Sequence, residues 1–152
     1  MSLESVRAFL SAHAPDIEII ETADSSSTVA LAAEAHGVHP SQIAKTICLR
    51  VGEEAMLVVA GGLARLDNRK FKNTFGGKGR MLGPEEVVEV TSHPVGGVCP
   101  FGLPRILPIY CDVSLRRFDE VVPAAGSPNS AVRISTERLA KLTGATWVDV
   151  CQ

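Results

Sequence analysis

A lysine lies among apolar residues in a stretch that is typical of a β-strand. Between Ile43 and Leu49, side chains on a strand would alternate between two faces, which puts Lys45 on the face of Ile47 and Leu49. An ammonium group on an apolar face must reach water along its stem, find a partner, or bind an anionic ligand. Lys45 is therefore a candidate for binding an anion. The alternative is a strand-end lysine whose head group reaches water.

Two glycine-rich segments could bring backbone N–H groups close to a ligand. The first runs from Val95 to Gly102 and contains Gly96-Gly97, inside a Pro- and Gly-rich stretch at 92–108. Glycines have no Cβ to hold a ligand away, and the prolines stiffen the loop. The second, from Gly126 to Ser130, offers hydroxyl and amide groups on a turn. Either segment could instead be a plain connecting loop, although long irregular segments in a domain are often functional.

Basic residues concentrate between positions 65 and 80. Six cations and one acid give this segment a net charge of +5, which leaves −7 on the other 136 residues of a chain whose total is −2. Such a concentration suits contact with a phosphate backbone, and the alternative is a solvated helix face. We call these six residues the basic patch: Arg65, Arg69, Lys70, Lys72, Lys78 and Arg80.

Several familiar chemistries are missing from the sequence. The glycines around Lys78 do not have the spacing of a phosphate-binding P-loop, and no Gly-x-Ser-x-Gly elbow occurs. Cys99 lies in the first glycine segment, but no sequence neighbour would lower the pKa of its thiol, so we expect it to pack rather than react. The four cysteines lack zinc-site spacing, so we expect reduced thiols and neither a metal nor a cofactor.

Length and composition favour a globular protein in the cytoplasm. The chain has 152 residues, of which 45% are hydrophobic and 21% are charged, which suits one ordered domain. No apolar stretch is long enough to cross a membrane, and the N-terminus does not resemble a signal peptide. The near-neutral charge argues against a protein that coats nucleic acid without specificity.

Periodicity and capping residues predict five helices and seven strands, and hence an α+β domain with a mixed sheet. The helices are predicted from Ser2 to about His13, from Thr28 to His36, from Asp67 to about Phe75, from Pro84 onward, and from Ser135 to Leu142. The strands are predicted at Ile17 to Glu21, Ile43 to Val51, Ala55 to Ala60, Ile106 to Val113, Glu120 to Pro123, Ala131 to Ile134, and Trp147 to Val150.

The order of these motifs resembles the YbaK family. The matching features are a lysine in Ile43-Ala44-Lys45-Thr46-Ile47, a following hairpin, Gly96-x-x-x-Pro100, and then Ala125-Gly126-Ser127. The family is similar to the editing insertion domain of bacterial prolyl-tRNA synthetase. The resemblance implies one domain over residues 1–152, with a partly barrel-like mixed sheet flanked by helices.

The resemblance also implies a deacylase that hydrolyses wrongly charged aminoacyl-tRNA, commonly tRNA for proline carrying a small amino acid such as Ala or Cys. Lys45 matches the lysine that engages the 3′-terminal nucleotide, and backbone N–H groups near Gly97 and Val98 are expected to polarise the ester carbonyl. The basic patch would contact the acceptor stem, and a synthetase could be a further partner. The candidate substrate-binding residues are Thr28, Gly96, Cys99, Pro100, Phe101, Gly126, Ser127 and Asn129.

One position departs from the family pattern. The synthetase insertion domains carry a pocket histidine after the Gly-Ser turn, whereas Pro128, Asn129 and Ser130 follow it here. The amino acid that is removed is therefore open. A tRNA- or nucleotide-binding module without catalysis, or an interaction protein with a vestigial pocket, are the alternative functions.

Overall fold

A computed structural model describes residues 2–152. Its five α-helices follow the capping residues of the sequence. The Oγ1 of Thr28 accepts a hydrogen bond from the Leu31 N–H at the start of one helix, and Gly37 ends that helix in the left-handed conformation (φ 66°). The helices are α1 (Ser2–His13), α2 (Val29–His36), α3 (Asn68–Phe75), α4 (Pro84–Thr91) and α5 (Thr136–Thr143).

The strands within residues 2–152 are more numerous than the sequence predicts, and several are shorter. They are β1 (Ile20–Glu21), β2 (Ile43–Val51), β3 (Glu54–Gly61), β4 (Arg80–Met81), β5 (Ile109–Asp112), β6 (Glu120–Pro123), β7 (Ser130–Ala131), β8 (Ile134–Ser135) and β9 (Thr146–Val148). Two short 3-10 helices, Pro40–Gln42 and Val113–Arg117, precede β2 and follow β5.

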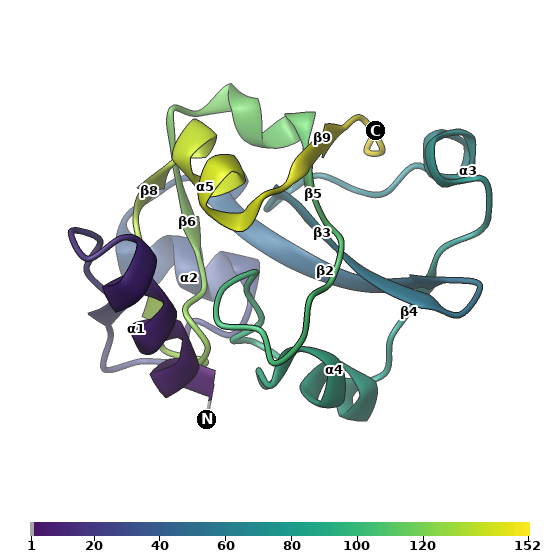
Figure 1. Ribbon diagram of the computed structural model, residues 1–152. Coiled ribbons are helices and arrows are strands. Elements are labelled where there is room, and N and C mark those ends of the chain that lie inside the picture. The colour runs from purple at the N-terminus through teal and green to yellow at the C-terminus, as the bar shows by residue number, and fades with distance from the viewer. Residues whose placement is uncertain (1) are drawn as a thin grey trace.

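Seven of these strands form one curled, mixed sheet around the β2–β3 hairpin (Figure 1). The strand order is β8-β6-β2-β3-β5-β9, and β4 also pairs with β2. The β2–β3 and β2–β4 pairs are antiparallel, whereas β2–β6, β3–β5 and β5–β9 are parallel. The separate pair β1–β7 ties the segment before α2 to the segment after β6. The predicted α+β class and mixed sheet are confirmed.

The outer edge of β2 is paired only at its two ends. At the start of the strand, Ile43 and Ala44 pair with β6, and at the far end Leu49 and Arg50 pair with β4. Residues 45–48 have a neighbouring strand on the β3 side alone. The sheet therefore has a gap beside β2, between β6 and β4.

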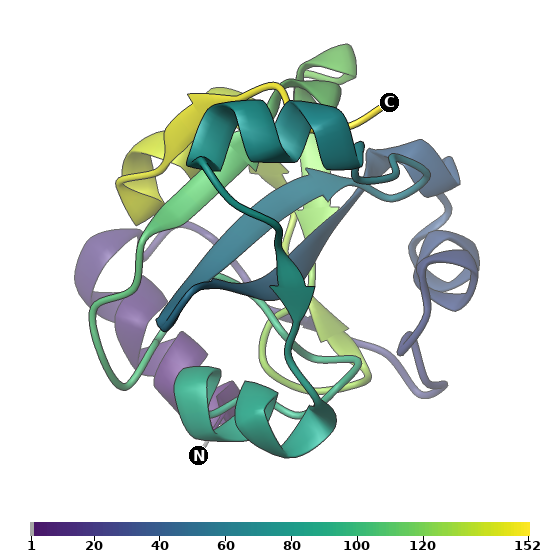
Figure 2. The same ribbon diagram turned by 90° about the vertical axis from the view of Figure 1, so that its right-hand side faces the viewer.

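Helices pack on both faces of β2. Leu49 packs in a cluster with Phe71 of α3, whereas Cys48, on the opposite face, packs in a cluster with Val87 of α4. Figure 2 shows α3 and α4 on opposite sides of the hairpin, with β4 between them along the chain. A third cluster joins α1 and α5 through Val6, Leu10 and Leu139. The faces of β2 therefore follow the alternation of its sequence.

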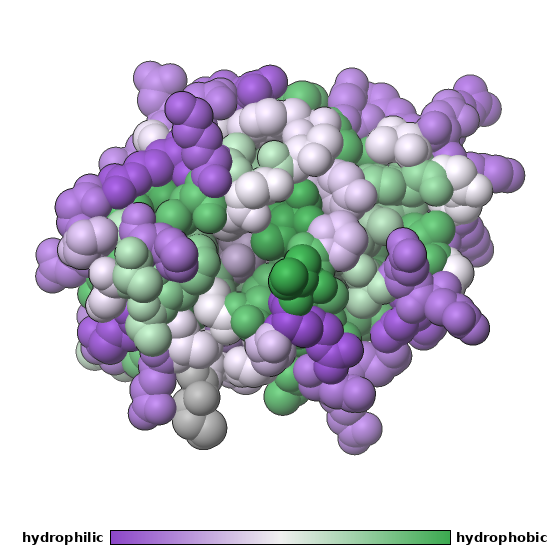
Figure 3. All heavy atoms as spheres, viewed as in Figure 1, coloured by the Kyte–Doolittle hydropathy of each residue, from purple (hydrophilic) through white to green (hydrophobic). Residues whose placement is uncertain are grey.

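Several predicted strands are wrong in their bounds, and the one predicted at Trp147 to Val150 is observed at Thr146–Val148. Only the last two residues of 17–21 pair with another strand. The strand predicted at 131–134 is two strands, because Ala131 pairs with β1 and Ile134 pairs with β6. The strand predicted from Ile106 begins at Ile109, and Ile106 is fully exposed. Figure 3 shows apolar surface near the middle of the face that carries this segment.

The cysteines are buried and unbridged. All four, Cys48, Cys99, Cys111 and Cys151, are free thiols. Within residues 2–152, no helix has the length and apolar character needed to span a lipid bilayer.

Candidate functional site

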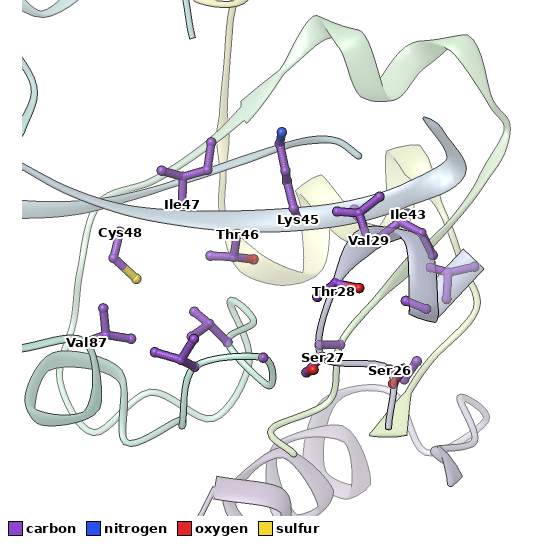
Figure 4. Close-up of a pocket in the computed structure, with 18 of the residues that line it drawn as sticks. Ser26, Ser27, Thr28, Val29, Ile43, Lys45, Thr46, Ile47, Cys48 and Val87 are labelled. Atoms are coloured by element: carbon purple, nitrogen blue, oxygen red, sulfur yellow. The ribbon is translucent and has the colours of Figure 1, made fainter. Parts of the chain in front are cut away.

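A pocket of about 410 Å³ lies beside the unpaired part of β2. Its walls come from the segment that leads into α2, from β2, from the β4–α4 connection, and from the first glycine segment. In Figure 4, Ser27 and Thr28 lie across the pocket from Thr46 and Cys48, with Val87 of α4 below Cys48. The gap between β6 and β4 thus leaves room for a ligand at the centre of the sheet.

Most of the pocket wall is apolar. Ile43, Val87, Val95 and Val98 contribute aliphatic side chains, and Met81 lies at the rim with 61% of its surface exposed. Apart from Lys45, the polar side chains in the wall are short and carry hydroxyl groups: Ser26, Ser27, Thr28, Thr46 and Ser130. The pocket therefore suits a small side chain with few polar atoms.

The two glycine-rich segments meet behind this pocket. The Gly126 N–H donates to the Gly97 carbonyl oxygen at 3.0 Å. A Cβ on Gly97 would lie 2.6 Å from the Ser127 nitrogen, and a Cβ on Gly96 would lie 2.8 Å from the Ser27 Cβ. Gly96 also has φ +93°, which side chains rarely allow. These glycines permit a close approach between chain segments, and only Gly96 borders the pocket itself.

The structure brings four of the residues predicted from the sequence to the pocket wall: Thr28, Lys45, Gly96 and Val98. It does not bring Gly97 there, and the Gly97 N–H already donates to the Pro94 carbonyl at 2.9 Å. The remaining predicted residues do not line this pocket: Cys99, Pro100, Phe101, Gly126, Ser127 and Asn129.

Asn129 and Ser127 hold the segment that precedes α2. The Asn129 Nδ2 donates to the Thr22 carbonyl at 2.9 Å, and the Ser127 Oγ donates to the Asn129 Oδ1 at 3.1 Å. The Ser26 N–H donates to the Pro128 carbonyl at 2.6 Å. The second glycine segment thus positions Ser26, and with it one wall of the pocket.

Lys45 borders the pocket, but its ammonium group lies elsewhere. Figure 4 shows its side chain leaving β2 on the face opposite Thr46 and Cys48. The Nζ donates to the Ala64 carbonyl oxygen. Within residues 2–152, no carboxylate pairs with this ammonium group. Burial lowers the pKa of Lys45 from its usual value. Lys45 is thus a half-buried cation with no carboxylate partner in the described part of the chain.

Cys99 is buried next to a histidine that sequence reasoning did not select. The Cys99 Sγ lies 3.6 Å from the Nε2 of His93, and this Nε2 lies 2.7 Å from the Phe101 carbonyl oxygen. Neither side chain is exposed. Burial raises the pKa of the Cys99 thiol to about 12, so the thiol stays protonated. Cys99 and His93 therefore pack together inside the first glycine segment and supply no nucleophile.

The pocket wall contains no ionisable base of the usual kinds. Among the residues in 2–152 that line it, none is His, Asp or Glu. Burial raises the pKa of the Cys48 thiol to about 11, so this thiol is also protonated. A serine or cysteine nucleophile activated by a neighbouring base therefore has no partner in this wall.

The basic patch lies along α3 and the segment that leads to the pocket rim. Lys70 pairs with Asp149 at 3.1 Å, and Arg80 approaches Glu86 at 3.7 Å. The other four, Arg65, Arg69, Lys72 and Lys78, are exposed and have no ion-pair partner in the described part of the chain. Arg80 is followed directly by Met81 at the rim, so the patch is continuous with the pocket.

Comparisons with known proteins relate the chain to an editing-domain family. A model of the aminoacyl-tRNA editing domain matches residues 23–142. The uncharacterized protein YwhH of Bacillus subtilis is 46% identical over all of this chain and 98% of its own length. A proline–tRNA ligase of Maridesulfovibrio salexigens is 28% identical over 95% of this chain, which spans 26% of that ligase.

A solved structure has the same fold over nearly its whole length. It is described as "a putative trans-editing enzyme for prolyl tRNA synthetase", and it superposes with a TM-score of 0.92 at 34% identity. The superposition covers 99% of this chain and 97% of that one. The chain belongs to the aminoacyl-tRNA editing domain family.

Proposed function

We propose that this protein hydrolyses the ester bond of mischarged aminoacyl-tRNA, acting in trans as one editing domain over residues 1–152. The observation that carries the proposal is the small, largely apolar pocket beside the unpaired part of β2, in a chain of the editing-domain family. The pocket would hold the aminoacyl group. We propose as substrate tRNA for proline charged with a small wrong amino acid such as Ala or Cys.

The reaction needs no covalent intermediate with the protein. The oxygen of a water molecule forms a bond to the ester carbonyl carbon, and the bond from that carbon to the ribose oxygen breaks. The ribose oxygen takes a proton, which leaves a free amino acid and a tRNA with a free hydroxyl group. An aminoacyl ester is already activated, so positioning and charge stabilisation can carry most of the catalysis. The absence of His, Asp and Glu from the described pocket wall supports this route, with a ribose hydroxyl of the substrate assisting proton transfer.

Lys45 and Val98 take the electrostatic roles in the proposal. The Lys45 ammonium exchanges its Ala64 carbonyl for the anionic phosphate of the 3′-terminal nucleotide, a stronger partner for a cation. The Val98 N–H has no acceptor within residues 2–152, and Val98 borders the pocket, so it can polarise the ester carbonyl. Gly96, without a Cβ, lets this loop lie against Ser27 in the facing wall.

The basic patch would bind the acceptor stem of the tRNA. Its four exposed, unpaired cations can contact phosphates, and its continuity with the pocket rim would guide the 3′-terminal adenosine inward. The body of the protein is acidic, which limits binding to this region. A synthetase that releases the mischarged tRNA would be a further partner.

One observation favours a second function. The Lys45 ammonium lies on the opposite face of β2 from the pocket. This position also fits a module that binds tRNA through Lys45 without hydrolysing the ester. The two functions are separated by a deacylation screen. It uses tRNAs for proline, alanine, serine and threonine, each charged with several small amino acids. Turnover of at least one pair supports the hydrolase, whereas tight binding without turnover on the whole panel supports the binding module.

A further inference from the structure

Thr46 lies at the centre of the unpaired edge of β2. The pairing with β6 ends at Ala44, and the pairing with β4 begins at Leu49. In an antiparallel ladder, the N–H and C=O of one residue point to the same edge, and alternate residues point to the same side. The Cys48 carbonyl accepts from the Leu82 N–H at 3.1 Å on the outer edge. The backbone groups of Thr46, two residues earlier, therefore also face outward.

These backbone groups have no protein partner. Within residues 2–152, no strand pairs with the outer edge at Thr46, and no loop or side chain bonds to its N–H or C=O on that side. Backbone polar groups inside a protein are nearly always bonded. An unpaired stretch of strand beside a pocket is thus available to a ligand, as in strand-edge recognition of peptides.

The side chain of Thr46 adds a third unpartnered group. Its Oγ1 is buried and has no hydrogen-bond partner within the described chain. Thr46 borders the pocket, and Figure 4 shows it on the pocket side of β2 together with Cys48. Much of the pocket wall is aliphatic, including Ile43 and Val98. A buried hydroxyl without a hydrogen-bond partner lowers the stability of the protein, unless a bound ligand supplies the hydrogen bond.

We propose that Thr46 binds the aminoacyl group of the substrate. Its carbonyl oxygen accepts a hydrogen bond from the α-ammonium group, and its hydroxyl bonds to a heteroatom on the β-carbon of the amino acid. The preferred substrates are then serine- or cysteine-like residues rather than equally large hydrocarbon ones. This inference rests on the proposed hydrolysis and names the amino-acid class within it.

The role of the Thr46 hydroxyl is tested with two aminoacyl esters of the same tRNA that differ in one group. Seryl and 2-aminobutyryl groups have the same number of heavy atoms, but serine has a hydroxyl where 2-aminobutyrate has a methyl. Each rate is divided by the spontaneous hydrolysis rate of that ester. We expect the wild-type protein to prefer the seryl ester about tenfold in kcat/KM, as one hydrogen bond allows. Thr46→Val should abolish the preference, and Thr46→Ser should retain it.

The carbonyl is tested through the substrate, because a substitution cannot remove it. Alanyl and propionyl esters of the same tRNA differ by the α-ammonium group. After the same correction for spontaneous hydrolysis, we expect the alanyl ester to be hydrolysed about tenfold faster or more. Equal corrected rates would overturn the assignment of the Thr46 carbonyl.

The outcomes separate this inference from the function on which it rests. If the wild-type protein hydrolyses none of the esters, both fail together. If it hydrolyses them but Thr46→Val keeps the wild-type seryl preference, the hydroxyl assignment fails and the hydrolase remains. Unfolding midpoints check the variants, because Thr46→Val removes an unpartnered hydroxyl and should not lower stability.

Discussion

The Gly97 carbonyl oxygen accepts a hydrogen bond from the Gly126 N–H at 3.0 Å and so joins two glycine-rich segments that lie far apart in the sequence. This contact needs the absence of a side chain, because a Cβ on Gly97 would lie 2.6 Å from the Ser127 nitrogen. The second segment in turn carries Pro128, whose carbonyl holds Ser26 in the pocket wall. The glycines therefore shape the pocket from behind.

Gly97→Ala should distort the pocket. The added methyl group meets backbone rather than a flexible side chain, so the two segments must move apart. We expect a loss of about 1–3 kcal/mol in unfolding free energy, measured by chemical denaturation, together with a large fall in kcat/KM. Gly83→Ala is the matched control, because a Cβ there meets nothing within 4 Å. Equal behaviour of the two variants would contradict this role of Gly97.

His93 should make the protein less stable in mild acid. Burial lowers the pKa of His93 below its usual 6.5, so the folded state resists protonation while the unfolded state accepts it. The contribution of the neutral His93 side chain to the free energy of unfolding is fully present above about pH 6.5. It is lost as the pH falls from there toward the lowered pKa. His93→Gln can keep the donor to the Phe101 carbonyl without titrating. Denaturation between pH 5 and 7 should show a shallower loss for this variant, and parallel curves would refute the assignment.

Cys99 should be dispensable for chemistry. Its thiol is fully buried and its pKa is raised to about 12, so it forms no thiolate at neutral pH. We expect Cys99→Ala to keep kcat within about threefold and to lose about 1 kcal/mol of stability for the atom removed from the core. Iodoacetamide should not inactivate the native wild-type protein. Rapid inactivation together with loss of kcat in Cys99→Ala would instead identify a nucleophile.

The basic patch should affect tRNA binding rather than catalysis. The double variant Lys72→Glu, Lys78→Glu reverses two exposed, unpaired charges. We expect a higher KM for tRNA, a nearly unchanged kcat, and a smaller slope of log affinity against log salt, because fewer phosphates are neutralised. Lys141→Glu on α5 changes an exposed charge outside the patch and serves as the control. If the control weakens binding equally, the patch is not the tRNA contact.

The sequence predicted those parts of the fold that depend on local chemistry. Caps such as Thr28, glycine terminators such as Gly37, and the long apolar run of β2 gave bounds that the structure confirms. Two-residue strands such as β4 were missed, because Arg80 and Met81 carry no strand pattern and pair only through the edge of β2. Long-range pairing of this kind is not encoded in local periodicity.

The candidate site was predicted unevenly for the same reason. Alternation on β2 marked Lys45 as a cation on an apolar face, and the same alternation places Thr46 on the other face, toward the pocket. Thr46 was not selected, because a threonine in a strand is ordinary until the gap between β6 and β4 is known. His93 and the closeness of Gly97 to Ser127 likewise depend on contacts between distant segments.

The hydrolysis of mischarged tRNA by the wild-type protein and by Lys45→Ala tests the central claim most directly. Rates are measured on tRNA for proline that is charged with alanine, cysteine or serine. Lys141→Ala serves as the control, and an unfolding curve is recorded for each protein. The account predicts rapid release of at least one amino acid by the wild type and the control. It predicts a loss of at least about a hundredfold in kcat/KM for Lys45→Ala, with the fold retained. A folded Lys45→Ala variant with wild-type turnover would contradict the account.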